Sequence, residues 1–225
     1  MFHSNVMFFQ YVEDNKQVSI GITNSKAIKK GFYIGNITTA DLLESTPYRN
    51  SIDLITIKGK YIRQALQDSA GKLSADGKSL TSDGFLQVSG IKMTIDLSRS
   101  NDDRITKLKV KCTQCSEVIY EDLIDDQNYN VSINSFLGIQ GGDGYIVFPE
   151  NKVSQLDGPL DTDVIKKYLE ANSPISKDTI KDQNRITILG GTSGSARSIK
   201  STNTLILETI LYVVLVQCLC LSLVK

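Results

Sequence analysis

The chain has 225 residues, in which 25 Lys and Arg are balanced by 25 Asp and Glu, and it contains one histidine. Its length allows one well-cored domain with little room for a second, and its zero net charge excludes the basic field that nucleic-acid binding needs. The single histidine, His3, cannot supply a metal-dependent phosphoesterase site or a Ser-His-Asp constellation.

The N-terminal residues 1–17 lack the features of a secretory signal peptide. They carry no positive n-region, and the short apolar run 6–9 is soon followed by Glu13 and Asp14. We therefore expect residues 1–17 to be the end of a preceding part of a longer protein.

The next segments alternate strand and helix patterns. Val18–Thr23 predicts a strand that leads into a loop, and Thr38 with Asp41 has the form of a capping box that opens a short helix ended by Pro47. A strand is expected next at 52–57, then an amphipathic helix at 61–70 with Gly71 as its stop, and a polar loop at 72–84.

The second half of the chain adds more strands and one helix. We expect strands at 85–97, 104–111, 129–133 and 185–189, and a helix at 162–171. The order lacks a strict βαβ rhythm, so the fold class is α+β: a mixed β-sheet with flanking helices in a single domain spanning 18–190. A C-terminal hydrophobic tail follows this domain.

A glycine-rich loop follows the strand at 129–133. It contains Gly141-Gly142-Asp143-Gly144, between the aromatics Phe136 and Tyr145. Such a run is most often a plain tight turn, because glycine accepts positive φ. A carboxylate held between aromatic rings would also suit a nucleoside, whose base stacks and whose ribose hydroxyls donate hydrogen bonds.

Three blocks together resemble the C-terminal domain of the 5′-nucleotidase family. They are the Phe-Leu…Gly-Gly-Asp-Gly-Tyr loop, the segment Thr46–Leu54 followed by Ile57-Lys58-Gly59, and the segment Phe85–Ile91 running on to Ile95–Ser98. The order and spacing are those of the family, over about residues 15–190, and are most similar to the membrane-anchored ecto-5′-nucleotidases and the animal apyrases.

The resemblance implies a set of substrate-binding residues. Tyr48 and Phe136 would stack the base, Asp143 would bind the ribose hydroxyls, Asn24 would contact the base, and Lys29 would contact phosphate where the family has arginine. Lysine keeps the charge of arginine but loses its planar fork.

The loop that follows Asn24 departs from the family pattern, which is rich in glycine at these positions. Ser25, Lys26 and Ala27 take those places, and a Lys26 side chain there would crowd the substrate. From the residues alone, a solvated loop with two lysines is the plain interpretation.

Two sequons and the Cys-x-x-Cys pair indicate the cellular compartment of the chain; the other two cysteines, Cys218 and Cys220, lie in the apolar tail. Asn36 and Asn130 are glycosylation acceptors by sequence. Cys112 and Cys115 could form half a zinc site, a redox motif or a short-loop disulfide. Together with the tail, the sequons favour a secreted route and therefore the disulfide.

The C-terminal composition is typical of a GPI-attachment signal. A small and polar spacer at 191–204 precedes an apolar stretch at 205–225, whose length of roughly 30 Å also fits a transmembrane helix. We expect GPI attachment at Ser193, with Gly191 and Ser195 as alternatives, because a basic cytoplasmic flank is missing.

Two functions are consistent with these features. In the first, the chain is the substrate-binding domain of an extracellular 5′-nucleotidase or apyrase that hydrolyses nucleoside 5′-phosphates such as AMP. A missing metallophosphoesterase domain would supply two zinc-type divalent ions, because this chain has no site for them. In the second, it is a non-catalytic, surface-anchored nucleotide-binding protein. On either view the GPI anchor would hold it at the extracellular face of the plasma membrane, with pairing into a homodimer left open.

Overall fold

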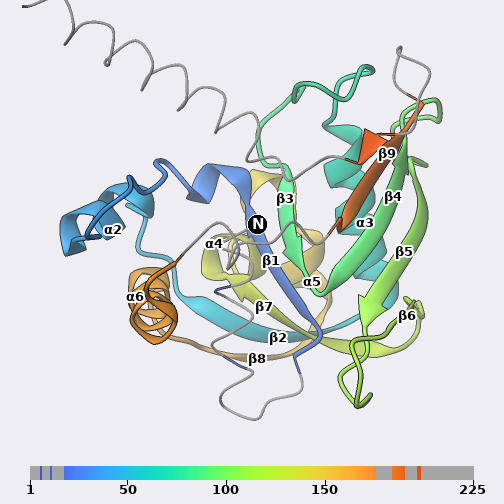
Figure 1. The fold of residues 1–225 in the computed structure, drawn as a ribbon. Coiled ribbons are helices and arrows are strands. Elements are labelled where there is room, and N and C mark those ends of the chain that lie inside the picture. Colours follow the sequence, from blue (N-terminus) through green and yellow to red (C-terminus); the bar gives the residue numbers. More distant parts are fainter. Residues whose placement is uncertain (1–5, 7–10, 12–17, 176–183, 191–196, 199–225) are drawn as a thin grey trace, which may run out of the picture.

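The computed structural model describes residues 18–175, 184–190 and 197–198, together with Val6 and Tyr11. Two five-stranded mixed β-sheets form its frame, and helices are inserted between their strands (Figure 1). The α+β class expected from the sequence is confirmed, but the strands divide into two sheets rather than one.

The first sheet carries the candidate site. Its strand order is β3-β1-β7-β2-β8, in which β1 and β7 are parallel and the other neighbours are antiparallel. The bounds are β1 Ile20–Asn24, β2 Ile52–Lys58, β3 Leu86–Ser89, β7 Asn128–Asn134 and β8 Lys152–Leu156. Because β1 and β7 are parallel neighbours, their last residues, Asn24 and Asn134, lie at the same edge.

The second sheet has the order β10-β9-β4-β5-β6, with β4 and β9 parallel. Its strands are β4 Ile91–Asp96, β5 Ile105–Lys111, β6 Tyr120–Asp122, β9 Ile186–Leu189 and β10 Arg197–Ser198. It lies to the right of the first sheet in Figure 1.

The segment at 85–97, expected as one strand, is split between the two sheets. Gly90 separates β3 from β4. Its φ is +71°, a backbone conformation that residues other than glycine rarely adopt. A Cβ at this position would overlap the carbonyl oxygen of Ser19. The single-strand prediction was therefore wrong at Gly90, where the chain turns from one sheet into the other.

Helices cover the sheets. They are α2 Thr39–Ser45, α3 Gly59–Gly71, α4 Ser135–Gly138, α5 Val147–Asn151 and α6 Asp161–Asn172, with 3₁₀ turns η1 Ser25–Ala27 and η2 Gly142–Gly144. The capping box of α2 is confirmed: Thr38 accepts from the Asp41 amide, and the Asp41 carboxylate accepts from the Thr38 amide.

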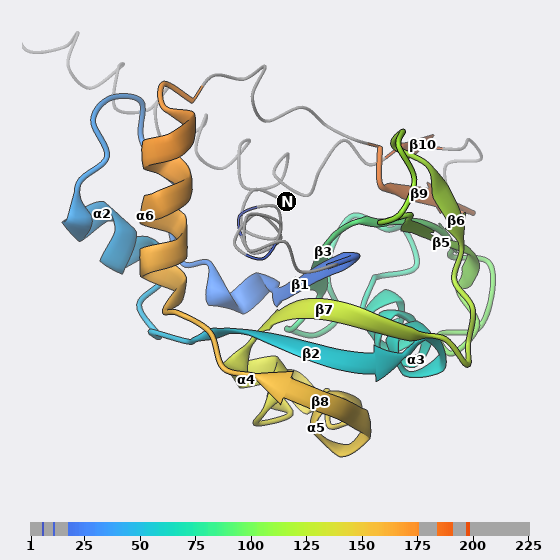
Figure 2. The same cartoon turned by 90° about the horizontal axis from the view of Figure 1, so that it is seen from below.

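Two apolar cores hold these elements together. The larger core joins both sheets to the buried face of α3, including Ile62, Ala65 and Leu66. The smaller core lies under α2 and α6, which are side by side in Figure 2, and it includes Val6 and Tyr11. The candidate site lies where β1 and β7 end, close to both cores.

Among the described residues no helix is long and apolar enough to cross a membrane. The expected anchor segment, Ser193 and residues 205–225, lies outside the described residues.

Candidate functional site

The glycine-rich loop is a 3₁₀ turn that holds a carboxylate in an uncommon conformation. Asp143 has a φ of 53°, in the left-handed region that aspartate tolerates better than most side chains do. Its Oδ2 accepts a hydrogen bond of 2.7 Å from Nδ2 of Asn24. In the part of the chain that the structure describes, the other carboxylate oxygen, Oδ1, accepts no hydrogen bond and is left for a ligand.

A second asparagine holds Asn24 in this orientation. Asn134 Nδ2 donates to Asn24 Oδ1 at 3.0 Å and to Thr23 Oγ1 at 3.1 Å. Asn134 Oδ1 accepts the amide of Leu137 at 3.0 Å and so caps α4. Because the side-chain oxygen Oδ1 of Asn24 accepts this hydrogen bond, its side-chain nitrogen Nδ2 faces Asp143.

Phe136 lies against the same loop. It occupies the first turn of α4, is partly buried, and packs on the larger core. Its ring lies so close to Gly142 that a Cβ at residue 142 would overlap the ring carbons. The Phe136 ring is thereby packed against Gly142, the residue before Asp143.

Tyr48 and Lys29 form a second part of the site. Tyr48 follows α2 and its side chain is 53% exposed. The Nζ of Lys29 lies 5.3 Å from the centroid of the Tyr48 ring, within the range of a cation–π interaction. The structure thus brings an exposed aromatic ring and a cation together on the segments next to η1.

Lys26 connects these two parts. Its Nζ lies 2.8 Å from the carboxylate of Asp83. The hydrogen bond to Asp83 raises the pKa of Lys26, and the nearby Asp143 carboxylate and Tyr48 phenol act in the same direction. Lys26 therefore lies near enough to Asp143 and Tyr48 to interact with both electrostatically, and its ammonium is held toward Asp83.

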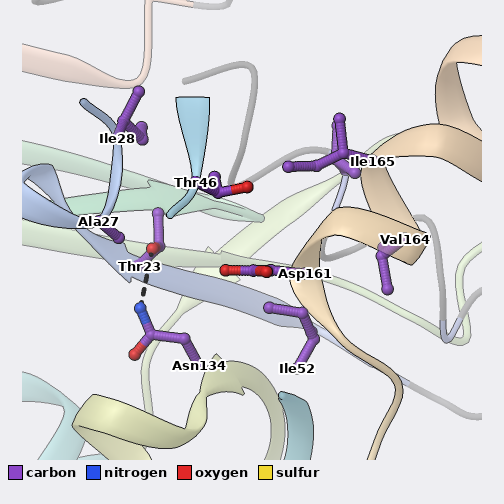
Figure 3. A pocket seen from close by; sticks show the side chains of 10 residues that line it. Thr23, Ala27, Ile28, Thr46, Ile52, Asn134, Asp161, Val164 and Ile165 are labelled. Carbon is purple, nitrogen blue, oxygen red and sulfur yellow. Dashed lines mark hydrogen bonds between the residues drawn. The ribbon is translucent and has the colours of Figure 1, made fainter. Parts of the chain in front are cut away.

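A separate hollow lies behind the site. It is lined by apolar side chains, among them Ile52 of β2 and Val164 of α6, together with Thr23, Thr46, Asn134 and Asp161. Figure 3 shows Asp161 pointing from the start of α6 into this hollow. Burial raises the pKa of Asp161 to about 6, even though its carboxylate accepts backbone hydrogen bonds. Tyr48, Phe136 and Asp143 do not line the hollow.

The remaining predicted site residues lie elsewhere. Cys112 and Cys115 form the expected disulfide. Asn36 is exposed, whereas Asn130 is half-buried in the central strand β7 and accepts a hydrogen bond from Thr56 Oγ1 at 2.9 Å. Asn36 is therefore the more accessible of the two sequons.

The described residues do not fit a dinuclear metal site. Within the ranges described, side chains of metal-binding type gather in one group, Cys112, Cys115 and Glu121. The disulfide removes both thiols from that group. We therefore derive no metal-dependent step from these residues.

Three residues of the site were not identified from the sequence. Asn134 orients Asn24, Gly84 packs against the Asp143 side chain, and Lys72 donates from Nζ to the Asp143 carbonyl oxygen at 3.2 Å. A buried asparagine at a helix N-cap is the one sequence signal that could have pointed to Asn134.

Comparison with known proteins gives a consistent family. The family model for the C-terminal domain of 5′-nucleotidases matches residues 2–150. The chain is 31% identical to an apyrase of Tabanus yao over 175 residues, which are 76% of this chain and 30% of the apyrase. It is 36% identical to a 5′-nucleotidase of Bos taurus over 136 residues, which are 60% of this chain and 22% of that enzyme.

The fold agrees with solved structures. A 5′-nucleotidase precursor from Thermus thermophilus superimposes with a TM-score of 0.66 at 26% identity, covering 83% of this chain and 34% of that structure. The chain thus spans about a third or less of the length of these relatives.

Proposed function

Because the chain belongs to the 5′-nucleotidase C-terminal domain family, we propose that its site binds the nucleoside part of a nucleoside 5′-phosphate such as AMP. The observation that carries this proposal is the Asp143 carboxylate, which is held at one oxygen by Asn24 on a loop that packs against the ring of Phe136. A ribose presents two neighbouring hydroxyl donors to such an oxygen, and a base presents a flat face to such a ring.

The two parts of the site would act on different parts of the ligand. Phe136 and the exposed Tyr48 would stack the base, which contributes about 1–3 kcal/mol per aromatic ring in other proteins. Asp143 would accept hydrogen bonds from the ribose, and the buried Asn24 would hold the Asp143 carboxylate in place rather than contact the base. On ligand binding, the Lys29 ammonium would move from the Tyr48 ring to the phosphate and neutralise its charge. The base would then take the place of the ammonium on the Tyr48 ring.

Hydrolysis would need a second domain. The matched part is 30% of the apyrase and 22% of the Bos taurus enzyme, and the described residues here do not form a dinuclear site. We propose that a separate metallophosphoesterase domain holds two divalent ions and supplies the attacking water. The chain described here would position the substrate.

An extracellular, membrane-anchored location is also part of the proposal. Relatives include a snake venom 5′-nucleotidase of Naja atra and an apyrase of Tabanus yao, and the disulfide suits an oxidising compartment. The spacer and apolar tail support a GPI anchor attached at Ser193. Release of the cell-surface protein by a phosphatidylinositol-specific phospholipase C would test the anchor, and Ser193→Pro would test the attachment residue.

Calorimetric titration of the chain with adenosine and AMP tests the binding function. We expect both ligands to bind, and Phe136→Ala to weaken both by about tenfold, the loss of one stacked ring. Phe9→Ala, an aromatic far along the chain from the loop, serves as the control. Equal affinity of Phe136→Ala and the unchanged protein would remove the assignment of Phe136.

A phosphate-release assay, followed by a domain fusion, separates the two functions. Phosphate release from AMP by this chain alone, in the presence of divalent metal, would contradict our proposal that another domain supplies the chemistry. Binding without hydrolysis fits both a substrate-binding domain and a non-catalytic binder. Fusion to the phosphoesterase domain of a relative then decides, since only a substrate-binding domain should restore hydrolysis.

A further inference from the structure

Lys72 lies directly beneath the loop that carries Asp143, and its backbone is fixed on both sides. It follows the last residue of α3, and its amide donates to the carbonyl of Ser69 at 3.2 Å. Its own carbonyl accepts the amide of Thr81 at 2.7 Å and the Thr81 hydroxyl at 3.0 Å. The start of the Lys72 side chain is thereby held at a rigid helix end.

The ammonium of Lys72 is committed to the loop. Nζ donates to the Asp143 carbonyl oxygen at 3.2 Å and lies 4.2 Å from the centroid of the Tyr145 ring. That ring is buried, and its hydroxyl donates to the carbonyl of Gly84 at 2.9 Å. Burial lowers the pKa of Lys72, while the carboxylates of Asp143 and Asp68 oppose this effect and favour the charged form.

Two contacts therefore define the orientation of Asp143. Asn24 holds its carboxylate, and Lys72 holds its carbonyl oxygen. The residue between these contacts is in the left-handed region, which costs a non-glycine residue free energy and persists only where neighbours impose it. With its carbonyl released, the peptide could rotate toward commoner angles, and the free Oδ1 would turn away from the ligand.

We propose that Lys72 is a positioning residue for ribose recognition, and that it acts through the Asp143 carbonyl rather than by touching the nucleoside. This inference rests on the proposed binding function. Its consequence is selective, because a ligand that lacks ribose hydroxyls gains nothing from a correctly oriented Asp143 and should be indifferent to Lys72.

The test compares two ligands on the full chain: adenosine and 2′,3′-dideoxyadenosine. Lys72→Met keeps the aliphatic stem and removes the ammonium. We expect it to weaken adenosine about tenfold, which equals about 1.4 kcal/mol, and to change dideoxyadenosine by less than about twofold. Lys72→Arg should restore most of the adenosine affinity, because its guanidinium can also donate to the carbonyl. The control is Lys109→Met, an exposed lysine on β5.

Two results would overturn the proposal: an equal loss for both ligands, which indicates general loosening, or no loss for either. A double-mutant cycle with Asp143→Asn adds a second criterion, since additive effects on adenosine binding would also contradict it. If Lys72→Met does not fold, Lys72→Leu, which also keeps an apolar stem and removes the donor, replaces it in the same comparison.

Failure of the proposed function gives a different result. If the unchanged chain binds neither ligand, nucleoside binding itself is wrong. The positioning role is then decided by the amide chemical shifts of residues 142–144: a change in Lys72→Met that Lys72→Arg reverses supports it, and unchanged shifts reject it.

Discussion

Asn24 and Asp143 are 119 residues apart in the chain, and their side chains meet in a hydrogen bond of 2.7 Å. The bond lies at the edge of the first sheet, where β1 ends beside β7. It joins an amide whose orientation is fixed from behind by Asn134 to a carboxylate on a left-handed turn. The orientation of the Asp143 carboxylate therefore depends on a contact between segments that are far apart in the chain.

Removal of the Asn24 amide should therefore weaken nucleoside binding. Asn24→Ala leaves the Asp143 carboxylate unheld, and we expect a roughly tenfold rise in the Kd for adenosine, the usual effect of losing a hydrogen bond to a charged group. Calorimetric titration measures it. Asn101→Ala, in an exposed turn, is the matched control. An unchanged Kd in Asn24→Ala would show that the Asp143 orientation does not depend on this bond.

Two glycines of one loop should respond differently to alanine. In Gly142→Ala the new methyl overlaps the Phe136 ring, whereas in Gly144→Ala it meets open space, although residue 144 has a φ of +86°. Both variants should lose about 1 kcal/mol or more of stability, the second through backbone strain. Only Gly142→Ala should also displace Phe136 and weaken adenosine binding beyond this loss.

The comparison is made by thermal unfolding and by titration of the same samples. Equal affinities in the two variants would show that the Phe136 ring can move aside without cost, and would weaken its assignment as a stacking partner.

Lys29 should discriminate between a nucleotide and a nucleoside. Lys29→Gln removes a charge that only a phosphate can use, so we expect about fivefold weaker AMP binding and unchanged adenosine binding at low salt. Lys60→Gln is a matched control, because Lys60 Nζ also lies over a tyrosine ring, 5.0 Å from the centroid of Tyr61. A parallel loss for AMP and adenosine would mean that Lys29 acts by holding Tyr48 instead.

Asp161 should make stability depend on pH. Burial raises the pKa of Asp161 from the ordinary aspartate value of 3.8 to about 6. The folded chain therefore binds this proton more tightly than the unfolded chain. This contribution to stability is complete below about pH 4 and is lost as the pH rises through about 6, by up to about 3 kcal/mol.

In the unchanged protein, Asp161 Oδ1 accepts a hydrogen bond of 2.8 Å from the Thr162 amide. Asp161→Asn removes the charge and retains a side-chain oxygen that can accept this bond. We expect a higher free energy of unfolding than the parent at pH 7.5, with a difference that shrinks toward pH 4. Denaturant unfolding at several pH values measures it, with the exposed Asp163→Asn in the same turn as control. A difference that is independent of pH would contradict the raised pKa.

Local signals predicted much of the fold. Thr38 and Asp41 indicated the start of α2, and the spacing of Ile62, Ala65 and Leu66 indicated the buried face of α3, because both signals depend on neighbours in sequence. Gly90 was not recognised as a break, since its constraint comes from the Ser19 carbonyl on another strand. A period-two pattern continues across such a turn without a visible change.

The candidate site shows the same limit. Asp143 and Phe136 were identified from a glycine-rich motif and a resemblance, and the structure places both on one loop. Lys72 was assigned to an ordinary polar loop, because nothing near it in sequence shows that its ammonium reaches a carbonyl 71 residues away. Contacts of this kind depend on tertiary packing, and sequence periodicity carries no information about them.

The parallel pairing of β1 with β7 has a consequence for how binding and folding are linked. Asn24 and Asn134 become neighbours only when two strands separated by more than a hundred residues have been brought together. A nucleoside that requires both can bind only to chains that have completed this pairing. Ligand should therefore raise the melting temperature, and the rise should continue with the logarithm of ligand concentration above the Kd. A fragment cut anywhere between the two strands, once its halves separate, should lose affinity for the ligand entirely.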